Sequence, residues 1–443
     1  MKASPMRAPL IATLLFGVFS GAAINNIASA PLSLIADDFD TSPARITLVA
    51  SASGFALACC MPVSGWLSVR WGSRRVLVAA FTLLGLGCLM AATSQWVWLL
   101  VLSRGVQGIA MSVVPPTVMY ALPEIVGEGG RERALGWWAV ANGAGTAAGA
   151  PLGALIADTW GWRMMFLVFV PICGLLATAC LWLKSDAAPQ RRLDLRSALL
   201  LTGALMFLIG PAMVAGLSVP WAVMLLPGSI GLLLVVAFMR SLQTASSPFV
   251  EPSFLQSNGF LVGSLGGAAQ MFALGSISVL VPLMVVERFG SSVRIAGLFV
   301  LLVTVTMMLS APPISRVAPR FGASRLIATG LGVVASAIAA AATVMAAGLA
   351  VPFVVGCLVV TGLGLGLLQS PSAIAVSSEP SSRGSGVGLY NSVRFSGGVV
   401  GVGWLSIATL VGASGVQALW LASVPIAAAG LVVVLLRGRA PGR

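Results

Sequence analysis

The feature that most constrains the fold is a succession of long apolar runs separated by short polar or basic segments. About twenty apolar residues are enough for a helix to cross the hydrocarbon core of a bilayer. Only 8% of the residues are charged, whereas soluble domains carry about 25%. The sequence therefore predicts an all-α, multi-pass membrane protein with fourteen spans. The expected spans are 8–30, 46–67, 76–95, 97–122, 135–157, 163–183, 197–216, 220–239, 260–285, 295–314, 326–348, 350–376, 388–411 and 416–436.

The first run also resembles a secretory signal peptide, because a basic start precedes it and Ala28-Ser29-Ala30 resembles a cleavage site. However, Pro31 stands where a cleaved chain would begin. Asn25 and Asn26 interrupt the run in a way that suits a helix facing a cavity. We therefore expect this segment to be retained as the first span.

The basic residues predict the orientation of the spans. With both termini on the cytoplasmic side, nineteen of the 25 Lys and Arg residues fall on that side, four fall outside and two lie within spans. This bias is the pattern described by the positive-inside rule. Membrane orientation thus explains the net charge of +13, and we expect a lipid bilayer, not a nucleic acid, as the large partner of the chain.

Few groups are available for catalytic or metal chemistry. The chain has no histidine, and no acidic residue lies near the middle of an apolar run. The six cysteines all fall inside apolar runs and form no CxxC pair. We expect no enzyme activity, metal, cofactor or disulfide framework.

Arg104 is the first candidate for a functional residue, because it lies inside the run 97–122. Placing an arginine near the centre of a membrane helix costs roughly 2.5 to 3.5 kcal/mol on insertion scales, so such residues normally face a bundle interior or a wet cavity. The structural alternative is a guanidinium satisfied by neighbouring carbonyl groups, which only ties helices together.

Two loops indicate an internal repeat. Arg70-Trp71-Gly72 follows the second span, and Arg320-Phe321-Gly322 follows the tenth; in both, one or two small residues come next, followed by a base. Parallel repeats of this kind place the substrate path at their interface. We expect a six-span bundle at 1–184, a linker with two extra spans at 185–258, and a second six-span bundle at 259–443.

Several short motifs, which together extend over most of the chain, support a family resemblance. They are Gly65–Arg75, similar to GxLxDRxGRR; Arg104–Gly108, similar to RxxQG; Gly149–Ala154, similar to GPxxGG with its proline displaced by one residue; Gly161–Phe166, similar to GWRxxF; Pro248–Leu255, similar to an interfacial stretch; and Gly388–Gly401, similar to GxxNxxRxxGGxxG. The chain resembles the major facilitator superfamily and, within it, the fourteen-span drug:proton antiporter-2 family. The resemblance implies a major facilitator fold that works by alternating access, and we expect a monomer.

The resemblance also implies roles for particular residues. The residues expected in coupling and transport are Arg104, Gln107, Gly108, Asn391, Arg394, Asp37 and Asp38. Those expected in gating are Gly65, Arg70, Gly72, Arg74, Arg75, Gly145, Gly149, Pro151 and Gly153. Structural alternatives remain open: a loop that only fixes orientation, a plain packing seam for the glycines spaced by four, and an Arg394 that reaches the interface with its long side chain.

The sequence departs from the family pattern at two places. Val69 stands where the family usually carries an aspartate, which leaves gating by that charge in doubt. The first span offers Asn25 and Asn26 where the family usually has a proton-binding aspartate. The nearest acids, Asp37 and Asp38, could still exchange protons if burial or Arg104 tunes them, but clustered loop acids are more often simply solvated.

The leading functional hypothesis is export of lipophilic drugs or natural products across a bacterial cytoplasmic membrane in exchange for protons. The alternatives are exchange or facilitated diffusion of organic anions without protons, and a sensor or assembly partner with a transporter fold. The expected substrate-binding residues are Asn25, Asn26, Asn142, Gln270, Met271, Phe272, Gln369 and Tyr390.

Overall fold

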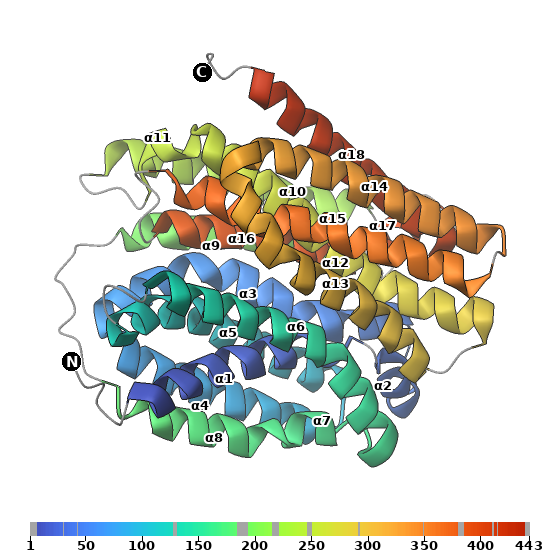
Figure 1. Cartoon of the computed structure of the whole chain (residues 1–443). Coiled ribbons are helices and arrows are strands. Elements are labelled where there is room, and N and C mark those ends of the chain that lie inside the picture. The colour runs from blue at the N-terminus through green and yellow to red at the C-terminus, as the bar shows by residue number, and fades with distance from the viewer. Residues whose placement is uncertain are drawn as a thin grey trace. The chain divides into compact units, whose positions relative to one another are not determined.

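The structure is a computed structural model in which every regular element of the described residues is a helix (Figure 1). It describes residues 7–29, 31–41, 43–126, 131–183, 194–214, 221–245, 250–290, 293–348, 350–379, 385–409, 412–413 and 415–438. The all-α prediction is therefore confirmed. The chain divides into two compact units, Met1–Leu195 and Arg196–Arg443. The three-part division expected from the sequence stays a prediction.

The first unit carries the helices of the first six expected spans. They are α1 (Arg7–Asn26), α2 (Leu32–Asp38), α3 (Pro43–Trp71), α4 (Ser73–Ala92), α5 (Val97–Val126), α6 (Arg131–Trp160), α7 (Met164–Leu167) and α8 (Phe169–Cys180). α5 packs against α3, α4, α1 and α6, whereas α8 packs against α4 and α1. α5 therefore contacts most of the helices of its unit.

The second unit carries the other helices. They are α9 (Leu195–Val214), which begins at the last residue of the first unit, α10 (Trp221–Thr244), α11 (Pro252–Leu255), α12 (Asn258–Phe289), α13 (Val293–Phe321), α14 (Ala323–Ala346), α15 (Val351–Ser377), α16 (Ser385–Val402), α17 (Trp404–Thr409) and α18 (Gly415–Gly438). Each of the fourteen apolar runs coincides with one helix or with two consecutive helices. Eleven helices among the described residues are long and apolar enough to cross a membrane. The count of fourteen spans and the cytoplasmic position of both termini stay predictions.

The predicted repeat is visible where α3 meets α4 and where α13 meets α14. The break between helices falls on Gly72, with φ 78° and ψ 152°, and on Gly322, with φ 82° and ψ 133°. A positive φ favours glycine, because a side chain at Cβ is disfavoured in that region. The two loops thus share both sequence and backbone conformation.

Glycines let helices approach closely in the first unit. The glycines of α6 at positions 145, 149 and 153 face the carbonyl oxygens of Phe19 and Ala23 on α1 and of Ile27 directly after it. A Cβ atom at Gly149 would lie 2.6 Å from the oxygen of Ala23. The spacing of four on both helices keeps this contact on one face over two turns. The packing seam predicted from the glycine spacing is therefore present, and its partner is α1.

A second glycine seam of the same kind occurs in the second unit. Gly397 and Gly401 of α16 face the carbonyl oxygens of Ala268 and Phe272 on α12. α12 and α16 belong to the first and fifth expected spans of their half, as α1 and α6 do in the other half. The repeat therefore extends from the loops to the helix packing.

Exposed tryptophans mark both ends of the first unit. Trp71 at the end of α3 and Trp182 just after α8 lie at one end, with the basic loop between α3 and α4. Trp96, Trp98 and Trp160 lie at the other end, where α5 begins and α6 ends. Tryptophan is enriched at the two membrane–water interfaces. This distribution fits a bundle whose two ends lie at the two surfaces of a bilayer.

The α1–α6 seam can be tested with a pair of alanine substitutions. Gly153→Ala should lower the free energy of unfolding by about 1–3 kcal/mol, because its Cβ would overlap the carbonyl oxygen of Ile27. Gly174→Ala on α8 is the control, since a Cβ there meets no atom within 4 Å. Thermal unfolding of both purified variants should show a lower Tm for the first only. Equal shifts would contradict the seam.

Candidate functional site

The side chain of Arg104 on α5 is fully buried, with an exposed fraction of 0%. Its Nε donates to the carbonyl oxygen of Val49 at 3.2 Å. Nη1 donates to the carbonyl oxygen of Ile24 at 2.8 Å and to Oε1 of Gln107 at 2.7 Å. Nη2 donates to the carbonyl oxygen of Asn25 at 2.6 Å and to Oγ of Ser53 at 2.8 Å. All five N–H groups of the guanidinium thus have an acceptor.

These acceptors connect three helices. Ile24 and Asn25 lie in the last turn of α1, where backbone carbonyl groups lack partners within the helix and the helix dipole is negative. Val49 and Ser53 lie one turn apart on α3. Arg104 therefore caps the end of α1 and fastens it to α3 and α5.

The neighbouring residues of the RxxQG stretch make this geometry possible. A Cβ atom at Gly108 would overlap the carbonyl oxygen of Ser53, so glycine lets α3 come within reach of Arg104. Gln107 accepts from Arg104 through Oε1, while its Nε2 lies 3.7 Å from Sγ of Cys88 on α4. Arg104, Gln107 and Gly108 thus form one local unit that joins four helices.

No carboxylate takes part in the hydrogen bonds of Arg104 among the described residues. Its partners are carbonyl oxygens, an amide and a hydroxyl group. This is the arrangement of the structural alternative, in which neighbouring carbonyl groups satisfy the guanidinium. A role of Arg104 in proton coupling stays a prediction.

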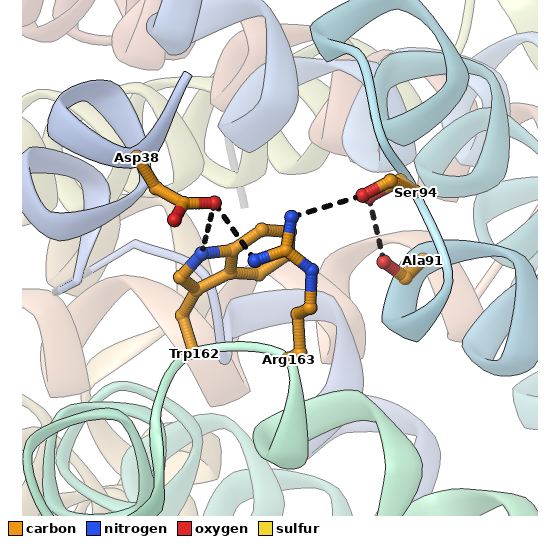
Figure 2. A network of polar contacts seen from close by, with 5 residues as sticks. All are labelled: Asp38, Ala91, Ser94, Trp162 and Arg163. Carbon is orange, nitrogen blue, oxygen red and sulfur yellow. Dashed lines mark hydrogen bonds and ion pairs between the residues drawn. The ribbon is translucent and has the colours of Figure 1, made fainter. Parts of the chain in front are cut away.

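Asp38 belongs to a different network (Figure 2), which lies at the end of α4 away from the basic loop. Its Oδ2 accepts from Nη1 of Arg163 at 2.7 Å and from Nε1 of Trp162 at 3.2 Å. Arg163 also donates through Nη2 to the carbonyl oxygen of Ser94 at 3.1 Å. The Arg163 guanidinium stacks on the Trp162 ring, with 4.3 Å from Cζ to the ring centroid. One arginine thus joins the α1–α3, α4–α5 and α6–α7 connections.

The path from Asp38 to Arg104 runs through aromatic rings. Trp162 makes an edge contact with Phe166, whose ring centroid lies 5.8 Å from Cζ of Arg104. These rings offer no continuous chain of hydrogen bonds between the carboxylate and the guanidinium. The structure therefore does not bring Asp38 to Arg104, and Asp37 is exposed on the same short helix.

The residues expected in gating lie in three places. Gly65 and Arg70 are on α3, Gly72 forms the break before α4, and Arg74 and Arg75 begin α4 and line a surface cavity. Gly145, Gly149 and Gly153 of α6 form the seam with α1, and Pro151 lies within the same helix. Their positions fit helix packing and the basic loop, and their part in gating stays a prediction.

The residues expected to bind substrate in the first unit surround the end of α1. Asn25 is half-buried, and its Oδ1 has no partner among the described residues. Asn26 donates through Nδ2 to the carbonyl oxygen of Ala22 at 2.9 Å. Asn142 on α6 is half-buried. Of these three amides, only that of Asn25 is recorded with a buried, unpartnered oxygen.

The second unit contains a group of polar side chains that we call the α12–α15–α16 polar cluster: Gln270 on α12, Gln369 and Ser372 on α15, and Tyr390 and Arg394 on α16. Each has a buried polar atom without a partner among the described residues: Oε1 of both glutamines, Oγ of Ser372, the hydroxyl of Tyr390 and Nε of Arg394. A buried polar group without a partner costs about 1–3 kcal/mol.

Two consecutive glycines of α12 hold this cluster together. A Cβ atom at Gly266 would lie 2.6 Å from Oγ of Ser372, and one at Gly267 would lie 3.0 Å from the hydroxyl oxygen of Tyr390. Gln270 follows one turn later on α12, as Arg394 follows Tyr390 on α16. The cluster thus lies within about two turns of α12.

The other predicted residues near the cluster have different surroundings. Phe272 is buried against Trp404, with 5.1 Å between the ring centroids. Met271 lies beside Gly398, at the α12–α16 contact. Asn391 donates through Nδ2 to the carbonyl oxygen of Val387 at 3.1 Å, within its own helix. Phe272 and Asn391 are thus engaged in contacts within the unit.

Sequence reasoning missed several residues of these sites. The contacts of Ser53 and Val49 with Arg104 could not be predicted, because a serine and a valine are ordinary residues of an apolar run. Ser372 also went unrecognised. Arg163 lies in the GWRxxF-like stretch. The predicted topology places it at the same membrane edge as the acids of the α1–α3 connection, and this position could have predicted its pairing with Asp38.

Comparison with known proteins gives a consistent set of relatives. A family model described as the Major Facilitator Superfamily matches residues 13–402 and 263–443. An uncharacterized MFS-type transporter, YvkA of Bacillus subtilis, is 23% identical over 403 residues, which is 88% of each chain. Putative multidrug resistance proteins MdtD are similar too. That of Escherichia fergusonii is 26% identical over 330 residues, and that of Salmonella typhi is 27% identical over 323; each match covers 72% of this chain and 68% of the relative.

The structural part of Arg104 can be tested with a conservative change. Arg104→Lys keeps a positive charge but has one nitrogen, which cannot reach the acceptors on both α1 and α3. We expect the free energy of unfolding to fall by about 1–3 kcal/mol, the cost of leaving buried acceptors unpaired. Thermal unfolding measures this, with Arg196→Lys, an exposed residue of α9, as the control. A Tm equal to that of the wild type would show that Arg104 does not hold α1 to α3 and α5.

Proposed function

This chain belongs to the Major Facilitator Superfamily, and we propose that it exports lipophilic drugs or natural products across a bacterial cytoplasmic membrane, in exchange for protons and by alternating access. As a member of a family of transporters, it is a multi-pass membrane transporter and not an enzyme. The major facilitator resemblance stated from the sequence is thereby confirmed. The substrate class, the direction and the coupled ion are the subject of the proposal.

The observation that carries the proposal is the α12–α15–α16 polar cluster. Its five side chains present buried polar atoms without a partner among the described residues. Most buried polar atoms in proteins are hydrogen-bonded, and an exception calls for an explanation such as a missing ligand or water. A substrate that reaches this cluster would supply the absent partners.

The chemistry of the cluster indicates the kind of substrate. The glutamine oxygens accept hydrogen bonds, Nε of Arg394 donates one, and the hydroxyls of Ser372 and Tyr390 can do either. The neighbouring side chain of Met271 is apolar. Small-molecule sites commonly combine an apolar lining with a few polar groups that fix orientation. A lipophilic molecule with a few hydrogen-bonding groups fits this combination.

The names of the relatives support drugs as the substrate class. Two of them are named putative multidrug resistance proteins. Extrusion of structurally varied lipophilic compounds would suit a site with few polar groups and flexible methionine at its edge, since such surfaces adapt to different ligands.

Coupling to protons is proposed from the resemblance of Arg104-Gly105-Val106-Gln107-Gly108 to the RxxQG motif. The only charged residue that is buried among the described residues is Arg104 itself. Of the two acids expected in coupling, Asp38 is paired with Arg163 at the surface, whereas Asp37 is exposed. We propose that proton exchange, if carried by a carboxylate of this unit, uses Asp38 by opening that pair.

A second candidate function is transport of organic anions without protons. It is favoured by one observation: Nε of Arg394 is buried without a partner, and among the described residues no buried carboxylate neutralises this charge. An anionic substrate would be attracted by such a site.

Gln270→Leu tests the substrate site. It removes a buried Oε1 that has no partner together with the long Nε2–Sδ contact to Met307, so thermal stability should stay within about 1 kcal/mol of the wild type, while dye efflux should fall about two- to tenfold through loss of a substrate hydrogen bond worth about 0.5–1.5 kcal/mol. Gln243→Leu, an exposed position of α10, is the matched control. Unchanged efflux in cells with equal amounts of membrane protein would remove Gln270 from the site.

The coupling is tested with a fluorescent lipophilic dye in expressing cells. A protonophore should abolish efflux if protons drive it, and Asp38→Asn should have the same effect without changing the amount of protein in the membrane. Efflux that ignores the protonophore, together with competition by organic anions that Arg394→Gln abolishes, would support the anion transporter instead.

A further inference from the structure

A surface cavity opens at the basic end of the first unit, away from the polar clusters described above. Its volume is about 470 Å³, and it is lined by Arg74, Arg75, Val78, Ala79 and Leu181. Arg74 and Arg75 lie in the first turn of α4, and Leu181 follows the end of α8, which packs against α4. The volume lies within the range of about 300–1,000 Å³ typical of small-molecule sites.

The mouth of this cavity carries two positive charges. Neither Arg74 nor Arg75 forms an ion pair or a side-chain hydrogen bond with any other described residue. They lie at the N-terminal end of a helix of 20 residues, where the helix dipole adds to the positive potential. The family aspartate that would offset these charges is replaced by Val69 in this chain. The position therefore attracts an anion.

The wall below the charges is apolar. Val78 and Ala79 follow Arg74 and Arg75 by four residues, so each apolar side chain lies about 6 Å further along the helix on the same face. Leu181 completes the wall and is exposed. An anion with an apolar extension would contact both parts of the cavity.

The depth of the cavity relative to the bilayer follows from its neighbours. Trp71 and Trp182, at the same end of the unit, are both exposed. Tryptophan side chains of this kind lie at the level of the lipid headgroups. The arginines are thus at headgroup level, and the apolar wall extends toward the hydrocarbon core. Basic pockets between transmembrane helices bind anionic lipid headgroups in other membrane proteins.

We propose that this cavity binds an anionic phospholipid, with its phosphate between Arg74 and Arg75 and the upper part of an acyl chain against Val78, Ala79 and Leu181. The site is confined to the first unit. In the second unit the corresponding turn, after Gly322, reads Ala323-Ser324-Arg325 and carries one base instead of two. The lipid site does not depend on the substrate or on the coupled ion.

Direct lipid binding tests the proposal. Native mass spectrometry of the delipidated full-length protein, titrated with phosphatidylglycerol or phosphatidylcholine, counts the retained lipids. The wild type should retain phosphatidylglycerol preferentially. The double variant Arg74→Gln/Arg75→Gln should bind it about thirtyfold more weakly, since each base near an anionic lipid contributes about a factor of five. Arg325→Gln, the repeat-related control, should bind like the wild type.

Two further measurements keep the proposal falsifiable. Ala79→Trp fills the apolar part while keeping both arginines, and it should also lose the preferential lipid; thermal unfolding verifies that each variant is folded. Glycerol phosphate, which has the headgroup chemistry without acyl chains, should not displace phosphatidylglycerol at millimolar concentration. Equal retention of both lipids, wild-type binding by the double variant, wild-type binding by Ala79→Trp or displacement by glycerol phosphate would each overturn the lipid site.

Discussion

The structure of the first unit depends on the hydrogen bonds of Arg104. In a bilayer there is little water to pair with polar groups, so a buried cation and the free carbonyl groups of a helix end must find partners within the protein. Arg104 meets both requirements at once. Its five N–H groups have acceptors, and two of these are carbonyl groups in the last turn of α1. A costly charge is thereby turned into the contact that holds α1 against α3 and α5.

Glycine seams bring the helices close enough for these hydrogen bonds to form. Such seams occur in both units, whereas the arginine network occurs in the first unit. Gly108 admits α3, and the glycines of α6 admit α1. Gly397 and Gly401 do the same between α16 and α12. In the second unit, however, Oε1 of Gln270 and the hydroxyl of Tyr390 have no partner among the described residues, while Nε2 of Gln270 donates to Sδ of Met307 at 3.5 Å. The two units therefore share a packing plan, whereas the hydrogen bonding of the polar side chains beside the seams differs between them.

What the sequence predicted well is what local patterns determine. Runs of about twenty apolar residues predict helices because a membrane span has that length, and glycines spaced by four predict a seam because they share a helix face. What it could not predict are the partners. Arg104 binds carbonyl groups 55 to 80 positions earlier in the chain, and Asp38 pairs with Arg163, which is 125 positions away. Such pairs depend on how helices pack, which no local pattern encodes. The same holds for the cavity beside Arg74, because Leu181, which follows the end of α8, is distant from it in sequence.

These contacts also limit how the helices of the first unit can move. The glycines of α6 contact the backbone of α1, so sliding one helix on the other would drive the carbonyl oxygens of α1 into neighbouring atoms of α6. α1 and α5 pack at Gly21 and Met111 and are joined in addition by two side-chain hydrogen bonds from Arg104 to the end of α1. A hydrogen bond can be replaced by another hydrogen bond when a helix moves, whereas an overlap between atoms cannot be relieved in this way. A change that offers the guanidinium a new acceptor would therefore alter the polar part of this contact and leave the packing between the helices in place. The hydrogen bonds of Arg104 are thus the part of the α1–α5 contact that a local change of charge could rearrange without overlap of atoms.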